Sequence, residues 1–521
     1  MNNKDSIIFT IPAKCRDCYK CLKVCPVKAI KMRDGQAHID PQKCILCGTC
    51  IRECPQKAKV YREDISLVKE FINNGEIIAA SIAPSFSSVY SGWKKSGFIA
   101  ALRKSGFNYV EETANGAYYI AKESIKAYYN SQKEQCICSA CPVINNYIEK
   151  YFSNLIQHLI PVTSPMIAHA KILKKKYGRN IKVVFIGPCI AKKFEAERFE
   201  NNETVDAVLT FNEVEKWFKE SKIHIENCAD GEFDCIAEKN SKLFALPGGL
   251  LKTAEIEQNK FDMNFIETSG HHEFLMAIDD FNSVENSNPL IEPLFCSGGC
   301  IGGPGLSAAQ NKMLLKKNIV SYSTGGNSKS NFEFNLPAAS LKTVFNKNIQ
   351  ITCQSYSEEE IERVLLMTGK TEASHLLNCG ACGYQSCREK AIAVLSGMAE
   401  SEMCLPYMRK IAEQKTDMLI DKSPNSIVIV DENLKILKMN PAFQELFKCE
   451  NSVYGKKISV VMDPFYFEKL INENTAQVEN NIELNIEGNN FYCHQILYSL
   501  KPDNQYAGIF IDVIPNRYQN Y

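Results

Sequence analysis

The segment 183-VVFIGPCIAKKFEAER-198 joins an apolar run to a cysteine and a lysine. Residues Val183 to Ile186 form a continuous apolar run, which is typical of a strand buried in a parallel sheet. The run ends in a loop that carries Cys189 and Lys192. The segment therefore predicts a buried strand that presents a thiol and an amine at its end.

Two further cysteine motifs lie on either side of this segment in the sequence. The first, QCICSACPV (135–143), contains Cys141, and the second, PLFCSGGCIGGPG (293–305), contains Cys296 and Cys300. The glycines of the second motif allow the backbone to approach a bulky cofactor closely. Together with Cys189, these motifs supply four cysteines from three loops, enough for one 4Fe–4S cubane.

The N-terminus contains two matching cysteine runs, CRDCYKCLKVCP (15–26) and CILCGTCIRECP (44–55). Two-residue gaps let three thiolates of one run wrap one cubane, while the fourth cysteine reaches the other cubane. Zinc ribbons would instead show pairs of CxxC. One predicted ligand set is Cys15, Cys18, Cys21 and Cys54, and the other is Cys44, Cys47, Cys50 and Cys25.

The C-terminal third begins with a further cysteine motif in CGACGYQSCREKAIAVLSGMAESEMC (379–404). Three ligands lie in a glycine-containing loop, and the fourth follows a stretch, 388–403, that is predicted to be helical. Four soft ligands suit either an iron–sulfur cluster or zinc, and the spacing favours a single 4Fe–4S cluster. The predicted ligands are Cys379, Cys382, Cys387 and Cys404.

The last part of the chain has the pattern of a small α+β domain. The segment 407–420 is charged, lacks glycine and proline, and predicts a connecting helix. SPNSIVIVDENLKILKMNPAFQELF (423–447) then predicts a strand, a turn, a second strand and a short helix that begins at Asn440 and Pro441. This order resembles the opening of a PAS domain.

Composition narrows the protein class. The 60 basic and 60 acidic residues balance, so the net charge gives no support for binding nucleic acid or anionic lipid. No apolar run reaches the roughly 18 residues that span a bilayer, and the N-terminus has no signal-peptide pattern. The chain has 23 cysteines, many of them at metal-ligand spacing. We therefore expect a cytoplasmic iron–sulfur protein from an anaerobe. We do not expect this protein to bind membranes.

The motifs SACP (139–142), GPCIAKKFEAER and CSGGCIGGPG, in this order, resemble the three cysteine motifs of the FeFe-hydrogenase catalytic domain. The segments IAPSF (82–86), TSPM (163–166), DAVLT (206–210) and FALPGGLL (244–251) also resemble that family. Residues 8–62 resemble a bacterial two-cluster ferredoxin.

These resemblances imply a multidomain α/β and α+β fold. We expect a ferredoxin-like two-cluster domain (1–62) and a two-lobed α/β FeFe-hydrogenase catalytic domain (63–350). A small helical module with one 4Fe–4S cluster (351–410) and a linker helix with a PAS-like α+β sensor domain (411–521) follow.

The resemblance also implies roles for single residues. Cys141, Cys189, Cys296 and Cys300 would hold the 4Fe–4S part of an H-cluster, and Cys300 would bridge to its diiron subsite, which carries CO, cyanide and a dithiolate amine. Lys192 would donate a charge-assisted hydrogen bond to a cyanide. Three more 4Fe–4S clusters would complete the cofactors. Other expected cavity positions are Pro84, Ser85, Ser164, Pro165, Gly187, Pro188 and Phe244.

The chain departs from the family at Ala140, where fast hydrogenases have a cysteine that passes protons to the bridgehead amine. A thiol can titrate and a methyl group cannot, and such relays contribute typically about 10²–10⁴-fold in rate. Gly187, Met166 and Leu294 also differ from the usual residues. Of the acidic relay, only Glu123 is a candidate.

The domain order resembles the sensory FeFe-hydrogenases. We expect a low-turnover reaction, H₂ ⇌ 2H⁺ + 2e⁻, whose redox state passes through the 4Fe–4S clusters to the PAS-like domain. Expected partners are a ferredoxin-like electron carrier, hydrogenase maturation proteins and a kinase, phosphatase or regulator; a homodimer is one candidate assembly. The alternatives are a metabolic hydrogenase with another proton route, for which Cys138 is a candidate, and a non-catalytic iron–sulfur module without the diiron subsite.

Overall fold

The computed structural model describes most of the chain. The described residues are 6–131, 135–201, 203–256, 264–281, 288–306, 311–325, 336–351, 354–486, 489–500 and 504–515. The chain divides into two units, Met1–Ser401 and Glu402–Tyr521, and each is described by itself. No helix among these residues has the length and apolar character needed to cross a membrane.

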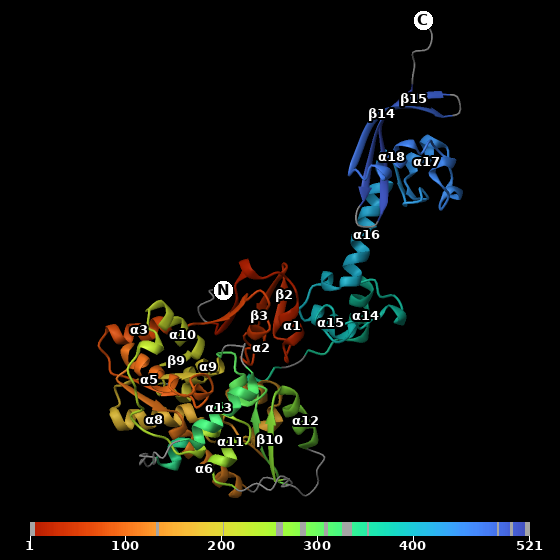
Figure 1. The fold of residues 1–521 in the computed structure, drawn as a ribbon. Helices are drawn as coiled ribbons and strands as arrows, with labels where there is room; N and C mark the ends of the chain where they lie inside the picture. The colour runs from red at the N-terminus through yellow and green to blue at the C-terminus, as the bar shows by residue number, and fades with distance from the viewer. Residues whose placement is uncertain are drawn as a thin grey trace. The chain divides into compact units, whose positions relative to one another are not determined.

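The first unit begins with a small domain of two antiparallel strand pairs (Figure 1). Strand β1 (Ile8–Thr10) pairs with β4 (Lys59–Tyr61), and β2 (Ile30–Arg33) pairs with β3 (Gln36–Ile39). The helices α1 (Lys20–Val24) and α2 (Thr49–Arg52) carry the cysteine runs. Gly48, at a φ of +70°, precedes α2, and a Cβ there would lie 2.5 Å from Pro304 Cγ. The missing side chain therefore lets this cysteine loop pack against the following domain.

The middle domain contains two parallel sheets. The larger has the order β6 (Tyr109–Glu112), β5 (Ile78–Ile82), β8 (Lys182–Gly187), β9 (Ala207–Thr210), and the smaller has the order β10 (Phe265–Ser269), β11 (Leu290–Leu294), β7 (Cys136–Ile137). The apolar run from Val183 to Ile186 is buried within β8, as predicted. Strands β5, β8, β9 and β11 are almost fully buried, which explains their near-continuous apolar runs, whereas β10 is partly exposed.

Helices surround these sheets. Their bounds are α3 (Ile65–Asn73), α4 (Phe86–Val89), α5 (Lys94–Lys104), α6 (Ala114–Tyr129), α7 (Pro142–Tyr151), α8 (Pro165–Tyr177), α9 (Ala191–Glu197), α10 (Phe211–Glu220), α11 (Gly249–Thr253), α12 (His271–Phe281) and α13 (Lys312–Thr324). The cysteine loops follow β7, β8 and β11, at the carboxyl ends of parallel strands, where α/β proteins build their sites.

The segment after the middle domain is helical, but less so than predicted. It contains α14 (Glu358–Met367) and α15 (Cys387–Leu395). The helix expected over 388–403 ends at Leu395, because Gly397 adopts a left-handed φ of 66°. Only a short 3₁₀ turn, Ser401–Met403, precedes Cys404.

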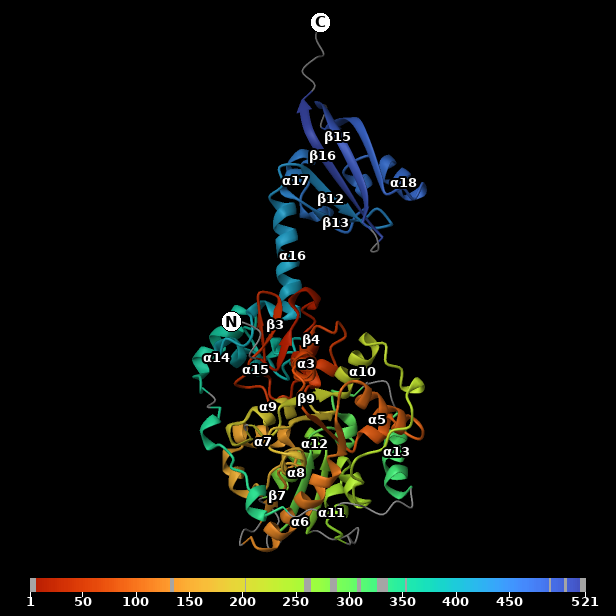
Figure 2. The same ribbon diagram turned by 90° about the vertical axis from the view of Figure 1, so that its left-hand side faces the viewer.

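The second unit consists of the long helix α16 (Leu405–Asp421) and a five-stranded antiparallel sheet (Figure 2). The strand order is β13 (Ile436–Met439), β12 (Ser426–Val430), β16 (Gln505–Pro515), β15 (Asn489–Leu500), β14 (Gln477–Ile486). Helices α17 (Pro441–Phe447) and α18 (Phe465–Asn472) pack on this sheet. Asn440 caps α17 by accepting from Phe443 N, so the predicted strand–turn–strand–helix order is confirmed.

Candidate functional site

A mostly apolar cavity lies at the carboxyl ends of β8 and β11. The four cysteines of the three loop motifs all line it. They are Cys141, Cys189, Cys296 and Cys300. The structure therefore brings together thiols that lie up to 159 positions apart (300 − 141) in the sequence.

Local structure places each thiol. Cys141 is the N-cap residue of α7, and Cys189 lies between β8 and α9. Cys300 belongs to a 3₁₀ turn, Gly299–Gly302, that directly follows the loop after β11. Gly299 has a φ of +80°, and a Cβ there would lie 2.5 Å from Ala245 O. Glycine is therefore required for the turn that presents Cys300.

The thiols of this cavity influence one another electrostatically. The pKa of Cys189 and Cys300 is raised to about 12, first by burial and next by the neighbouring Cys141, while the Lys192 ammonium acts in the opposite direction. Burial and the three other thiols raise the pKa of Cys296 well above its ordinary value. Four buried thiols that share one wall are a ligand set for soft metals, which bind the thiolate form.

The arrangement of the thiols fits an iron–sulfur cluster. Four thiols in the lining of one cavity suit a cubane, in which each cysteine sulfur binds a different iron. The side chain of Ser85 also fits a polar cofactor, because its Oγ is buried in the cavity wall without a hydrogen-bond partner among the described residues.

Lys192 reaches the same cavity from the first turn of α9. Its side chain is buried, and Nζ donates to Glu195 Oε2 at 2.6 Å. The Glu195 carboxylate thus gives this buried side chain a partner of opposite charge, without which a buried charge would be costly. Sequence reasoning did not single out Glu195, although its i,i+3 spacing from Lys192 was a usable signal.

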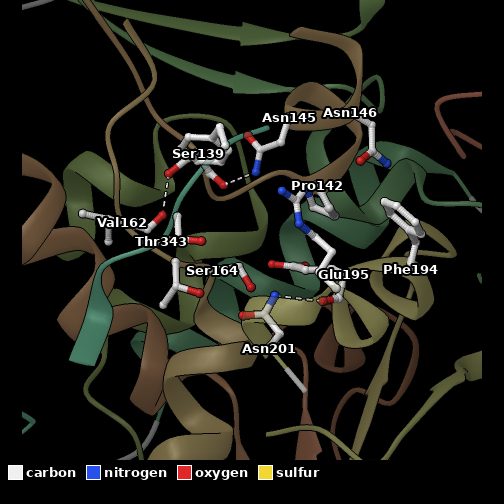
Figure 3. Close-up of a pocket in the computed structure, with 13 residues that line it drawn as sticks. Ser139, Pro142, Asn145, Asn146, Val162, Ser164, Phe194, Glu195, Asn201 and Thr343 are labelled. Carbon is white, nitrogen blue, oxygen red and sulfur yellow. Dashed lines mark hydrogen bonds between the residues drawn. The ribbon is translucent and has the colours of Figure 1, made fainter. Parts of the chain in front are cut away.

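Glu195 also lines a second, polar pocket (Figure 3). In this pocket Asn145 Nδ2 donates to Ser139 O at 2.8 Å. Ser164, expected to line the cofactor cavity, instead lines this neighbouring pocket, and its Oγ is buried without a partner among the described residues. Lys192 thus lines the thiol-lined cavity, and its hydrogen-bond partner Glu195 lines the second pocket.

The other expected cavity residues divide in the same way. Pro84, Ser85, Pro165, Pro188, Phe244 and Ala140 line the thiol-lined cavity, together with Met166 and Leu294. Gly187 does not: a Cβ there would lie 2.5 Å from the Phe185 ring, and it is the Phe185 ring that lines the cavity. The absent side chain at 187 thus gives Phe185 its place.

Two carboxylates complete this picture. Glu123 is partly exposed, lies 4.0 Å from Lys126 and does not line the cavity. Glu292 is buried on β11, and its Oε2 has no hydrogen-bond partner among the described residues. Burial raises the pKa of Glu292 to about 8, and burial and Glu292 together raise that of Cys138. Sequence reasoning missed Glu292, although a lone acid within the apolar run PLIEPLF was visible.

The N-terminal cysteines form the two groups that the spacing predicts. One pocket is lined by Cys15, Cys18, Cys21 and Cys54. In the other group, burial and then the thiols of Cys47, Cys44 and Cys25 raise the pKa of Cys50 well above its ordinary value. A Cys47 thiol near Cys296 links the second group to the thiol-lined cavity.

The third cysteine motif lies on a tight loop. Asn378, with a φ of 45°, accepts from Cys387 N at 2.8 Å and thereby closes this loop. Cys404 is the N-cap residue of α16 in the second unit. The ligand set Cys379, Cys382, Cys387 and Cys404 stays a prediction.

Four family models match the chain. Residues 76–304 match the iron only hydrogenase large subunit, C-terminal domain. Residues 14–58 match a 4Fe-4S dicluster domain, residues 377–406 an iron–sulfur cluster domain and residues 414–481 a PAS domain.

Curated relatives are hydrogenases and an assembly factor. Iron hydrogenase 1 of Clostridium pasteurianum is 25% identical over 290 residues, which cover 46% of this chain and 50% of that protein. The periplasmic Fe hydrogenase large subunit of Nitratidesulfovibrio vulgaris is 26% identical over 56% of this chain and 84% of its own length. The cytosolic Fe-S cluster assembly factor NAR1 of Vanderwaltozyma polyspora is 32% identical over 27% of this chain and 28% of its own length. The chain thus spans about half the length of the first of these relatives.

A solved structure of a variant of FeFe-hydrogenase HydA1 from Chlamydomonas reinhardtii matches with a TM-score of 0.41 and 16% identity, over 51% of this chain and 89% of that chain.

Proposed function

Because the chain is a PAS-containing, FeFe-hydrogenase-like protein, we propose that it is a sensory FeFe-hydrogenase that reacts slowly and reversibly with H₂. One observation carries the proposal. Ala140 lines the thiol-lined cavity directly before Cys141, and among the described lining residues only Lys192 and the four cysteines can titrate. The cavity can hold a cluster, but it lacks the thiol that would pass protons quickly.

Each residue of the cavity has a proposed task. The four cysteines would hold the 4Fe–4S part of an H-cluster, and Cys300 would be the cysteine that also serves its diiron subsite. Lys192, held by Glu195, would donate a charge-assisted hydrogen bond to a cyanide of that subsite. When bound, the H-cluster supplies the metal chemistry that separates H₂ into two protons and two electrons. The apolar remainder of the wall, including Phe185 and Phe244, keeps bulk water out.

The electrons would leave through the N-terminal clusters. Cys47, which belongs to the second N-terminal cysteine group, lies near Cys296. The redox state of the clusters then changes how the PAS domain binds a kinase, phosphatase or regulator in the cytoplasm. Such a signal requires that the two redox states differ in affinity for that partner.

Infrared spectroscopy of the matured protein under H₂ and under argon tests this function. We expect CO and cyanide bands that change reversibly between the two gases, together with H₂ evolution far below that of metabolic hydrogenases. Turnover at metabolic rates would favour a metabolic hydrogenase with another proton route.

A second candidate is a non-catalytic iron–sulfur module. It is favoured by the 32% identity to an Fe-S cluster assembly factor over 147 residues. Protein that binds iron at the four thiols but shows no CO or cyanide bands after maturation would support this candidate instead.

A further inference from the structure

A continuous row of hydrogen-bonding side chains connects the thiol-lined cavity to the protein surface. Thr113 lines the cavity, and its Oγ1 lies 2.7 Å from Ser81 Oγ. Ser81 Oγ lies 2.7 Å from His169 Nδ1, and His169 Nε2 lies 3.4 Å from Glu111 Oε2. Lys176 Nζ donates to Glu111 Oε1 at 2.7 Å. The row has no gap between Thr113 and Lys176.

The fold explains why these residues meet. Ser81 on β5 and Glu111 on β6 are direct neighbours in the parallel register. Thr113 follows β6, and His169 comes from α8, which packs on α6. Gly116 allows this close packing, because a Cβ there would lie 2.7 Å from His169 N. The imidazole therefore reaches into the sheet.

The burial of this row changes from complete to partial along its length. His169 and Ser81 are 0% exposed, whereas the Lys176 side chain is 34% exposed. Tyr177 OH also donates to Glu111 Oε1, at 2.6 Å. The inner end thus lies in the cavity wall and the outer end is in contact with solvent.

The chemistry of the members suits proton transfer. A hydroxyl group donates and accepts, and an imidazole can bind a proton at one nitrogen while it releases another from the second. Burial raises the pKa of Glu111, but hydrogen bonds from His169, Lys176 and Tyr177 lower it to about 2. The carboxylate of Glu111 accepts hydrogen bonds from Lys176 and Tyr177 at the outer end of the row. If these hydrogen bonds served only to join α8 to the sheet, their first member, Thr113, would not have to line the cavity.

We propose that Thr113, Ser81, His169 and Glu111 form a proton relay that serves the cavity in place of the missing thiol at position 140. This inference rests on the proposed reaction with H₂. For each H₂ consumed, two protons leave one at a time. Each passes from the cavity to Thr113 Oγ1, to Ser81 Oγ and to His169 Nδ1, while the Nε2 proton moves to Glu111 and then to solvent beside Lys176. The two electrons leave separately through the N-terminal clusters.

Variants of the hydroxyl groups test the relay in full-length, matured protein. Thr113→Val keeps the shape but removes the hydroxyl, and Ser81→Ala breaks the next link. We expect both to slow the H₂-induced change of the infrared bands about 10²-fold, with band intensities like those of the wild type. Thr113→Ser restores the hydroxyl and should stay within about threefold of the wild-type rate, as expected for a relay rather than a packing role.

The matched control is Tyr322→Phe. It removes a hydroxyl that donates at 2.8 Å to Glu112, the buried carboxylate next to Glu111 on β6, but lies outside the row. Its rate should equal that of the wild type. A wild-type rate for Thr113→Val with full band intensity, or equal slowing by Tyr322→Phe, would overturn the relay alone. A wild-type protein without CO and cyanide bands would overturn both the relay and the proposed function.

Discussion

Ala140 is the residue at which the cavity differs most in chemical capacity from that of a fast hydrogenase. Its methyl group lines the wall next to Cys141, and among the lining residues the side-chain hydroxyl groups belong to Thr113 and Ser85. The proposed relay would conduct protons through hydroxyls and a histidine, without a titrating thiol at position 140. On the proposed function, slow turnover would then follow from the cavity wall and would need no defect in the metal site.

Ala140→Cys should increase H₂ evolution, because a thiol, with an ordinary pKa of about 8.5, can titrate at this position. We expect a gain of about 10²-fold, the lower end of the range that general acid–base relays typically contribute. Gas chromatography of matured protein with a chemical reductant measures the rate. Ser139→Cys, one residue away, is the control, because Ser139 does not line this cavity. An unchanged rate at full infrared band intensity would contradict the role of position 140.

Glu292 is a second residue whose environment has a measurable consequence. Its Oε1 accepts from Leu250 N at 3.0 Å, while Oε2 is buried without a partner among the described residues. Burial raises the pKa of Glu292 in the folded protein from 4.5 to about 8. The folded state therefore binds this proton more tightly than the unfolded state, and stability is lost as the pH rises from about 4.5 through about 8.

Glu292→Gln should remove this loss, because the amide keeps an acceptor for Leu250 N and cannot ionise. Below about pH 4.5 we expect equal stability, and above pH 8 we expect the variant to be more stable by a few kcal/mol, since each pKa unit corresponds to about 1.4 kcal/mol. Anaerobic thermal unfolding between pH 5 and pH 9 measures the difference. Glu123→Gln, at a partly exposed carboxylate, should leave the profile unchanged. Parallel profiles of stability against pH for the wild type and Glu292→Gln would show that ionisation of Glu292 does not destabilise the folded protein.

At the scale of elements, the loop of the third cysteine motif packs on α1. Gly383 has a φ of +93°, and a Cβ there would lie 3.0 Å from Leu22 Cγ. Lys28 Nζ donates to Leu22 O, Lys23 O and Gly383 O, at 3.2, 3.3 and 2.9 Å. One ammonium thus joins the C-terminus of α1 to this loop, and its charge lies near the thiols of Cys25 and Cys382.

Lys28→Met should loosen this contact, because methionine keeps much of the side-chain length but removes three hydrogen bonds from a charged donor, each worth about 1.5–3 kcal/mol. We expect faster amide hydrogen exchange in residues 379–387 by mass spectrometry. Lys23→Met, at an exposed lysine of the same helix, is the matched control. Equal exchange in wild type and Lys28→Met would show that the ammonium does not hold the loop.

At the scale of the whole molecule, the part that matches the hydrogenase model and the part that matches the PAS model belong to different units of the chain. Helix α16 begins directly after Cys404 and has no buried residue. At its other end, Asn440 Nδ2 donates to Ile420 O at 3.1 Å and to Asn425 O at 2.8 Å. Helix α16 therefore connects Cys404, a predicted cluster ligand, to the first strand of the PAS domain. A conformational change at Cys404 can reach that strand along this helix.

Amide hydrogen exchange of the full-length protein, measured under H₂ and under argon, tests this coupling. We expect the exchange rates within residues 405–515 to differ between the two gases, because the two redox states must differ in the output domain for a signal to exist. Cys300→Ser, which removes the proposed bridging ligand, should abolish the difference together with the diiron bands. Identical exchange under both gases, in protein whose infrared bands do respond, would exclude a signal through this unit.

Features that depend on residues close together along the chain could be predicted from the sequence alone. The two-residue cysteine gaps predict the N-terminal groups, because ligands of one cubane can lie on one loop, and the structure brings Cys15, Cys18, Cys21 and Cys54 to one pocket. The apolar run before Cys189 predicted β8, and Asn440 followed by proline predicted the start of α17.

Which side chains from distant parts of the sequence line the same cavity could be seen only in the folded structure. Phe185, not a residue at position 187, fills the cavity wall, and Ser164 faces the second pocket. The row from Thr113 through Ser81 to His169 depends on strand register and on helix packing at Gly116. Such contacts arise from long-range packing, and no spacing along the chain encodes them. Candidate metal ligands could therefore be proposed from cysteine spacing, whereas the row of hydrogen-bonding side chains became visible only in the fold.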